Sequence, residues 1–284
     1  MNPAWRRSQG MVLIAVLWMV AALSIVVMGV VRSAREEARI VARMRQGVEA
    51  QALGDAAIHL VLQGMTARSV QPGRLEHVEV GFHGVDIAVQ VVPLNGLIDI
   101  NAAPAPLLAK LYMAAGVGGD AAQALAQATA EFRSRVDARG APRRFEAIEE
   151  LLQVPGVDYG LYARLADSVT ADSRGSGKVN PMAAPVGVLA VLAGGDTALA
   201  SRIAAGRDAS STQGTGMDTS SLDSAYLDNA VVRRYRIQAR VPMADGGWQQ
   251  VSRSVELMPR AREGMPWHTF NSSRSFKAAD RPAF

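Results

Sequence analysis

The chain has 284 residues, no cysteine, 49% hydrophobic residues and a formal net charge of +4, from 30 basic and 26 acidic residues. The lack of cysteine excludes a disulfide framework and a thiolate metal site, and the basic residues are too scattered for a nucleic-acid footprint. Length and apolar content allow one large or two small domains, each with its own core.

The most apolar stretch is residues 11–31, MVLIAVLWMVAALSIVVMGVV, which carries no charge and is just longer than the ~20 residues that cross a bilayer core. A buried core helix would need a polar face, and Ser24 alone does not supply one. Residues 1–10, MNPAWRRSQG, hold two arginines and no acidic residue, which favours a cytoplasmic N-terminus and an exported C-terminal part. A secretory signal would have a shorter apolar block closed by a small-residue cleavage site. The sequence therefore predicts a single membrane-spanning helix.

Residues 32–64 continue this helix. They are rich in Ala, Arg, Glu and Gln, and Ile40, Met44 and Val48 recur at a spacing of four. These features predict one unbroken helix over 11–64, whose second half is amphipathic and packs on a folded domain.

Two later segments alternate apolar and polar residues with the period of a β-strand. They are 77–94, with Gly84 between its halves, and 231–258, with the turn Asp245-Gly246-Gly247. Each predicts a β-hairpin, and neither hairpin is stable alone in water. We therefore expect an α+β fold: a long N-terminal helix packed on one antiparallel sheet, built from residues 65–95 and 230–258. A large α-helical domain, residues 96–229, is inserted between the strands.

The inserted domain contains an internal repeat. Residues 96–111, GLIDINAAPAPLLAKL, align without gaps to 177–192, GKVNPMAAPVGVLAVL, at an offset of 81. Each copy predicts a short extended piece, a polar turn and a helix with proline in its first turn. The repeat therefore predicts two similarly built helical halves, with turn and helix-start residues at Asp99, Asn101, Pro104, Asn180 and Pro185.

Residues 151–166, LLQVPGVDYGLYARLA, resemble a helix-hairpin-helix, a motif that grips nucleic-acid backbone through helix N-terminal amides. Carboxylates surround it at Glu146, Glu149, Glu150 and Asp158, and they would repel phosphate. We expect no nucleic-acid binding there. After a Gly/Ser/Thr/Asp-rich loop at 206–229, the strands resume, and the tail at 259–284 shows little periodicity and is expected to be mobile.

Catalytic residues are not indicated. The four histidines have no metal-ligand spacing, and no G-x-S-x-G elbow is present. We expect neither an enzyme nor a small-molecule substrate, although a membrane-anchored hydrolase stays open as an alternative.

The N-terminal leader resembles that of the type IV pilin and pseudopilin class, in which a prepilin peptidase cleaves after a glycine and the new N-terminus is methylated. The matching residues are Gly10 and Met11, followed by the apolar helix. Most members carry Glu at the fifth mature position, which here is Ala15. A subunit without that carboxylate need not be paired at that depth, and its absence is typical of minor pseudopilin K of the type II (general) secretion system.

Further blocks carry the same resemblance: RSAREEAR at 32–39, GLIDINAAP at 96–104, the block at 144–170 and GKVNPMAAP at 177–185. The resemblance implies a pilin-like fold with an inserted α-helical domain, in a single-pass protein of the bacterial inner membrane whose C-terminal domain is periplasmic. It implies a place at the pseudopilus tip with I- and J-type subunits and a role in exporting folded proteins across the outer membrane. Other pseudopilins, the prepilin peptidase and the inner-membrane secretion platform are implied partners. A minor pilin with a DNA-handling role is the alternative within the class.

The resemblance also implies calcium in the helical domain. The corresponding stretch, residues 131–146, has only Glu131, Asp137 and Glu146 among several arginines. Calcium takes six to eight oxygen ligands, so these residues predict a poor site, and we expect no cofactor. Met182 replaces an asparagine usual in the second motif, and Asn180 is expected to supply the turn instead.

Overall fold

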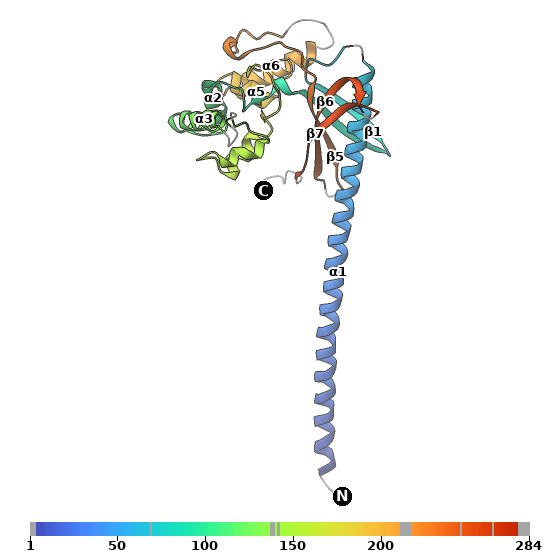
Figure 1. The fold of residues 1–284 in the computed structure, drawn as a ribbon. Coiled ribbons are helices and arrows are strands. Elements are labelled where there is room, and N and C mark those ends of the chain that lie inside the picture. The colour runs from blue at the N-terminus through green and yellow to red at the C-terminus, as the bar shows by residue number, and fades with distance from the viewer. Residues whose placement is uncertain are drawn as a thin grey trace. The chain divides into compact units, whose positions relative to one another are not determined.

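The computed structural model describes residues 4–68, 70–136, 140, 143–210, 217–244, 246–262 and 264–277 (Figure 1). The chain divides into two compact units, one ending at Ala52 and the other beginning at Leu53, which are described separately.

The first element is helix α1, Ala4–Ala67, which runs through the first unit and into the second. The continuous helix expected over 11–64 is present. It also includes residues 4–10 of the segment expected to be a leader. Helix-favouring residues and the absence of an internal proline account for its length.

The second unit contains a five-stranded sheet with the order β1-β2-β5-β6-β7, in which every neighbouring pair is antiparallel. The strands are β1 Glu76–Phe82, β2 Val85–Pro93, β5 Arg234–Pro242, β6 Trp248–Arg262 and β7 Met265–Lys277. Both expected hairpins are present, β1–β2 and β5–β6. His83 and Gly84 turn the first with φ of 50° and 77°, the left-handed values that a two-residue hairpin loop requires. Asp245, in the second turn, lies outside the described residues.

The expected mobile tail is wrong for the part of it that the structure describes. Strand β6 continues to Arg262, and residues 265–277 form β7 along its edge. The pairing register shifts between Ser254 and Val255, which breaks the simple alternation of sides along β7. Since β7 is also largely exposed, its sequence lacks the apolar periodicity that predicts a strand.

The last turns of α1 cover one face of the sheet. Ile58, Leu62 and Met65 are buried there, as are Ile237 and other apolar residues of the central strands. Gly54 allows the close approach, because a Cβ at this position would lie 2.6 Å from the side chain of Val251.

The expected inserted helical domain lies between β2 and β5, and Figure 1 shows its helices gathered beside the sheet. Its helices pack around an apolar core that includes Leu108 and Leu189 from the two repeat copies. The first helix of the helix-hairpin-helix-like segment is a 3-10 helix, η2. The elements are η1 Leu94–Gly96, β3 Ile98–Asp99, α2 Ala105–Ala114, α3 Gly119–Ser134, η2 Ile148–Gln153, α4 Tyr159–Leu165, β4 Val169–Thr170, α5 Val186–Leu192, α6 Thr197–Ser210 and η3 Ser224–Tyr226.

Candidate functional site

The most exposed apolar surface is on α1. Leu17, Trp18 and Ile25 are 69%, 73% and 74% exposed, and Ala15 lies on the same exposed stretch. Among the described residues, α1 is the one helix long and apolar enough to cross a membrane, with a mean hydropathy of 2.7 in its most apolar window. A helix that is apolar on all sides and is not buried in its own protein is typical of a membrane span.

Polar groups on this segment are satisfied locally. The hydroxyl of Ser24 donates to the carbonyl of Val20 at 2.8 Å, within the helix. Just beyond the apolar run, Arg32 and Glu36 form an ion pair at 3.2 Å one helical turn apart. The expected processing residues Gly10 and Met11 lie in α1, and the structure describes their backbone alone. The first charged pair therefore marks the end of the apolar surface.

The two repeat copies form equivalent turns in the inserted domain. The carboxylate Oδ1 of Asp99 accepts a hydrogen bond from the amide of Asn101 at 2.8 Å. The side-chain Oδ1 of Asn180 accepts from the amide of Met182 at 3.0 Å. These positions correspond at the repeat offset, and Asn180 supplies the second turn, as expected.

Each turn is followed by a helix that begins at an equivalent proline. Pro104 and Pro185 are the N-cap residues of α2 and α5, with φ of −67° and −61°. The helices that they start pack on one another in the domain core. The repeat thus produces two helical halves of the same local design.

The two copies also contact one another reciprocally through their glycines. A Cβ on Gly96 would lie 2.8 Å from the Cβ of Ala183 and closer still to its carbonyl group. A Cβ on Gly177 would overlap the carbonyl of Ala102 and lie 3.1 Å from the amide of Ala103. Ala102 and Ala183 correspond in the repeat, so each copy presses the same backbone carbonyl onto the glycine of the other. The halves are therefore related by an approximate two-fold arrangement.

Asn101 connects this centre to distant parts of the chain. Its Nδ2 donates to the carbonyls of Phe145 and Ala171, each at 2.9 Å, and its Oδ1 accepts from the amide of Phe145 at 2.8 Å. The neighbouring Asp99 accepts from the buried hydroxyl of Ser173 at 2.6 Å. All of these polar groups are satisfied by the fold, so the motif residues act in structure and not in chemistry.

The described residues in the stretch where the resemblance implies calcium include arginines that are already engaged within the fold. Arg133 donates to the carbonyl of Ile100 at 3.0 Å, and burial lowers its pKa while the charge of Asp99 opposes that shift. Arg143 lies over the ring of Phe132 at 4.3 Å. Among the described residues, no group of three or more His, Asp or Glu side chains is placed to hold a metal. Asp137 lies outside them.

A second acidic series is equally dispersed. Asp218 accepts from the amide of Ser220, Asp223 pairs with Lys110 at 2.8 Å, and Asp228 accepts from the hydroxyl of Ser176 at 2.7 Å. These contacts lower the pKa of all three carboxyl groups. Each of the three carboxylates thus has its own local hydrogen-bond or ion-pair partner, and these partners are different residues.

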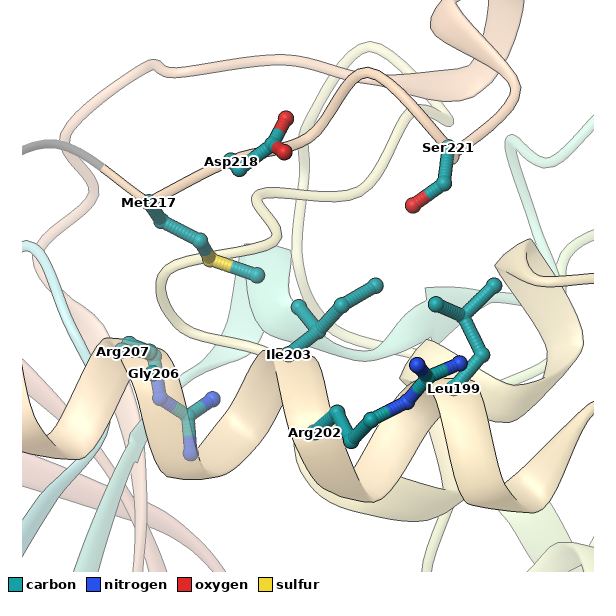
Figure 2. Close-up of a pocket in the computed structure, with 8 residues that line it drawn as sticks. All are labelled: Leu199, Arg202, Ile203, Gly206, Arg207, Met217, Asp218 and Ser221. Carbon is teal, nitrogen blue, oxygen red and sulfur yellow. The ribbon is translucent and has the colours of Figure 1, made fainter.

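A pocket of about 290 Å³ lies between α6 and the loop that follows it (Figure 2). Leu199, Ile203 and Met217 point into it, and Asp218 and Ser221 lie on the loop above. The guanidinium of the neighbouring Arg207 points to the other side of the helix, where it donates to the carbonyl of Ala184. The pocket's described lining residues include Ser221 and no histidine, the usual base for a serine nucleophile.

The helix-hairpin-helix-like segment packs within the domain. Gly156 turns it with φ of 92°, and a Cβ there would lie 2.8 Å from the side chain of Leu125 on α3. Asp158 caps α4 by accepting from the amide of Leu161 at 2.6 Å. A carboxylate therefore already occupies the helix N-terminus that a phosphate would use.

No protein-family model matches this chain, and no curated protein sequence matches it. Among solved structures, one similar chain comes from the crystal structure of the GspK-GspI-GspJ complex of the type 2 secretion system of enterotoxigenic Escherichia coli. The two chains are 16% identical, with a TM-score of 0.47, over 85% of this chain and 99% of the other.

Proposed function

We propose that this protein is a minor pseudopilin of the K type in a type II secretion system. It is a membrane-anchored assembly subunit without enzymatic activity. In this proposal it sits with I- and J-type subunits at the tip of the pseudopilus and starts the assembly that exports folded proteins.

The observation that carries the proposal is the exposed, uncharged apolar surface of α1 over residues 12–29 and 31. Such a surface is stable in lipid or against other apolar helices. A helix that leaves the bilayer and joins a helical bundle exchanges one apolar environment for another. The anchor thus serves as membrane span before assembly and as packing surface afterwards.

The inserted domain supports a place at the end of a filament. It follows β2 and precedes β5, and it carries its own core. A bulky domain attached to every subunit would obstruct close packing along a fibre, whereas a terminal subunit has a free side. Ala15 in place of the class glutamate is consistent with a subunit that has no neighbour beyond it.

Processing of the leader tests the proposal. In cells that contain a type II secretion system, the mature protein is expected to begin at Met11. Gly10→Val leaves a precursor that begins at Met1, because cleavage requires the small residue. Gln9→Ala is the matched control and is cleaved normally. N-terminal sequencing or intact mass measures both, and a wild-type protein that begins at Met1 contradicts the proposal.

The partners are tested by purification. The full chain in detergent, mixed with I- and J-type subunits of the same system, is expected to elute as a ternary complex on size exclusion. Separate elution of all three at micromolar concentration contradicts the assigned tip position.

A further inference from the structure

The sheet has a polar face turned away from α1. Paired residues of antiparallel strands point to the same side, so the register defines rows across the sheet. One row contains Gln90, Gln238, Ser252 and Ser273. The next row towards the second hairpin turn contains Arg240, Gln250 and Ser275. This face carries amide and hydroxyl groups where the opposite face carries the apolar side chains that pack on α1.

The inserted domain covers part of this face and leaves a groove of about 380 Å³. One side of the groove, its floor, is the polar face of β5, β6 and β7. The opposite side is formed by η2, α4 and β4 and includes Tyr159 and Tyr162. Arg236 joins β5 to β4 across the groove, because its guanidinium donates to the carbonyl of Val169 at 2.6 Å. Burial lowers the pKa of this guanidinium. The groove is therefore part of the fold and not a gap between loosely joined parts.

The polar side chains of the floor are available to a ligand. They form no side-chain hydrogen bond within the parts of the chain that the structure describes, and Ser252 is only 8% exposed. They are Gln238, Gln250, Ser252, Ser254, Asn271, Ser273 and Ser275.

The charges and rings of the groove define the kind of ligand. Its charged residues balance, with Glu149, Asp167 and Asp172 against Arg236, Arg274 and Lys277. Such a balance favours neither an anion nor a cation. The ring of Tyr159 is 73% exposed and lies 6.0 Å from that of Tyr162. Burial and the adjacent Glu149 raise the pKa of Tyr162 to about 12, so its hydroxyl stays protonated.

We propose that this groove binds a neutral oligosaccharide. Amide and hydroxyl groups on the floor pair with sugar hydroxyls, and the exposed tyrosine ring supplies a face for the apolar side of a sugar ring. The floor along β7 from Asn271 to Lys277 spans roughly 20 Å at the rise of a strand, which suits a short extended glycan. The inference depends on the proposed function only for the location of the groove outside the cytoplasm.

Titration of the full chain tests the groove. The protein is purified in lauryldimethylamine oxide, a detergent without a sugar head group, and titrated calorimetrically with hexa-N-acetylchitohexaose and with maltohexaose. Millimolar or tighter binding of either is expected, and the stronger one identifies the sugar class. Tyr159→Ala and Gln250→Leu are expected to weaken binding about tenfold. Gln90→Leu, on the same sheet face but outside the groove, is the matched control and leaves it unchanged.

Three results overturn the inference. They are no binding of either sugar at millimolar concentration, binding that the two groove variants do not weaken, and binding of a neutral Ser/Gly/Asn hexapeptide without binding of sugars. Because Tyr159 is largely exposed, its variant keeps the fold and the comparison stays interpretable. A protein that is not processed at Gly10 would still give the same titration, so failure of the proposed function is recognised separately.

Discussion

Replacing the two repeat glycines by alanine is expected to destabilise the inserted domain to different, calculable extents. On Gly96 the new methyl group would meet the backbone carbonyl of Ala183, with the Cβ of that residue at 2.8 Å. Ordinary contacts lie at 3.5–4.0 Å, so the two copies must separate by about 1 Å. Overpacking of this kind costs about 1–3 kcal/mol, and the obstacle here is backbone, which cannot rotate away.

Gly177→Ala carries a second cost. Gly177 has the same steric conflict with Ala102 and also a φ of 79°. The left-handed region adds about 1–2 kcal/mol for alanine. Each kcal/mol lowers the melting temperature of a domain of this size by about 2–4 °C. Gly177→Ala is thus expected to melt lowest, and Gly96→Ala several degrees above it.

Two other glycines separate the contributions. Gly84 has φ of 77° and nothing within 4 Å of an added Cβ, so Gly84→Ala reports the backbone cost alone. Gly64 lies in α1 with open space and ordinary φ, so Gly64→Ala is expected to stabilise slightly. Thermal melts followed by circular dichroism on the full chain in detergent give the ranking. If Gly96→Ala melts with Gly64→Ala, the reciprocal contact between the copies does not exist.

Three further outcomes are expected. Asn101→Ala removes three hydrogen bonds to Phe145 and Ala171 and is expected to lower the free energy of unfolding, measured in urea, by about 2–4 kcal/mol. Asn229→Ala, at an exposed position, is the control and is expected to leave it unchanged. Equal losses in the two variants would refute the bridging role of Asn101. Burial is the main cause, and the charge of Glu76 the second, of a rise in the pKa of Tyr235 to about 12, from about 10 in the unfolded chain. The free energy of unfolding therefore has its full value below pH ~10 and falls as the pH rises towards ~12. Tyr235→Phe is expected to make that fall shallower, and an unchanged slope would count against assigning the pH dependence to Tyr235. Deletion of residues 12–31 should move the protein from the carbonate-resistant membrane fraction to the soluble fraction, and retention in membranes would disprove the anchor.

The sequence predicted the elements whose conformation follows from their own residues, through strand periodicity or a helix-starting proline. The period-two segments became β1, β2, β5 and β6, and the prolines of the repeat start α2 and α5. Strand β7 escaped prediction, because it is an exposed edge and its partner β6 has a register shift. Its extended conformation comes from pairing and not from its own residues.

Long-range contacts were beyond the reach of the sequence for a different reason. The repeat at an offset of 81 predicted equal local structures, yet it held no information on how the copies face one another. The contact of Gly96 with Ala183 depends on tertiary packing. The same holds for Asn101, whose partners lie 44 and 70 residues away. The five motif residues and the turn at Asn180 were identifiable from the pattern, whereas the long-range partners of Asn101 were not.

The pairing of β2 with β5 brings the two ends of the inserted helical segment together. Pro93 and Tyr235 are direct partners, so the chain departs from the sheet and returns to it at adjacent points. If the intervening residues were excised, a short loop would be enough to rejoin the two strand ends. The two ends of the inserted segment are just as close to each other, so the segment can be inserted into the turn of another hairpin.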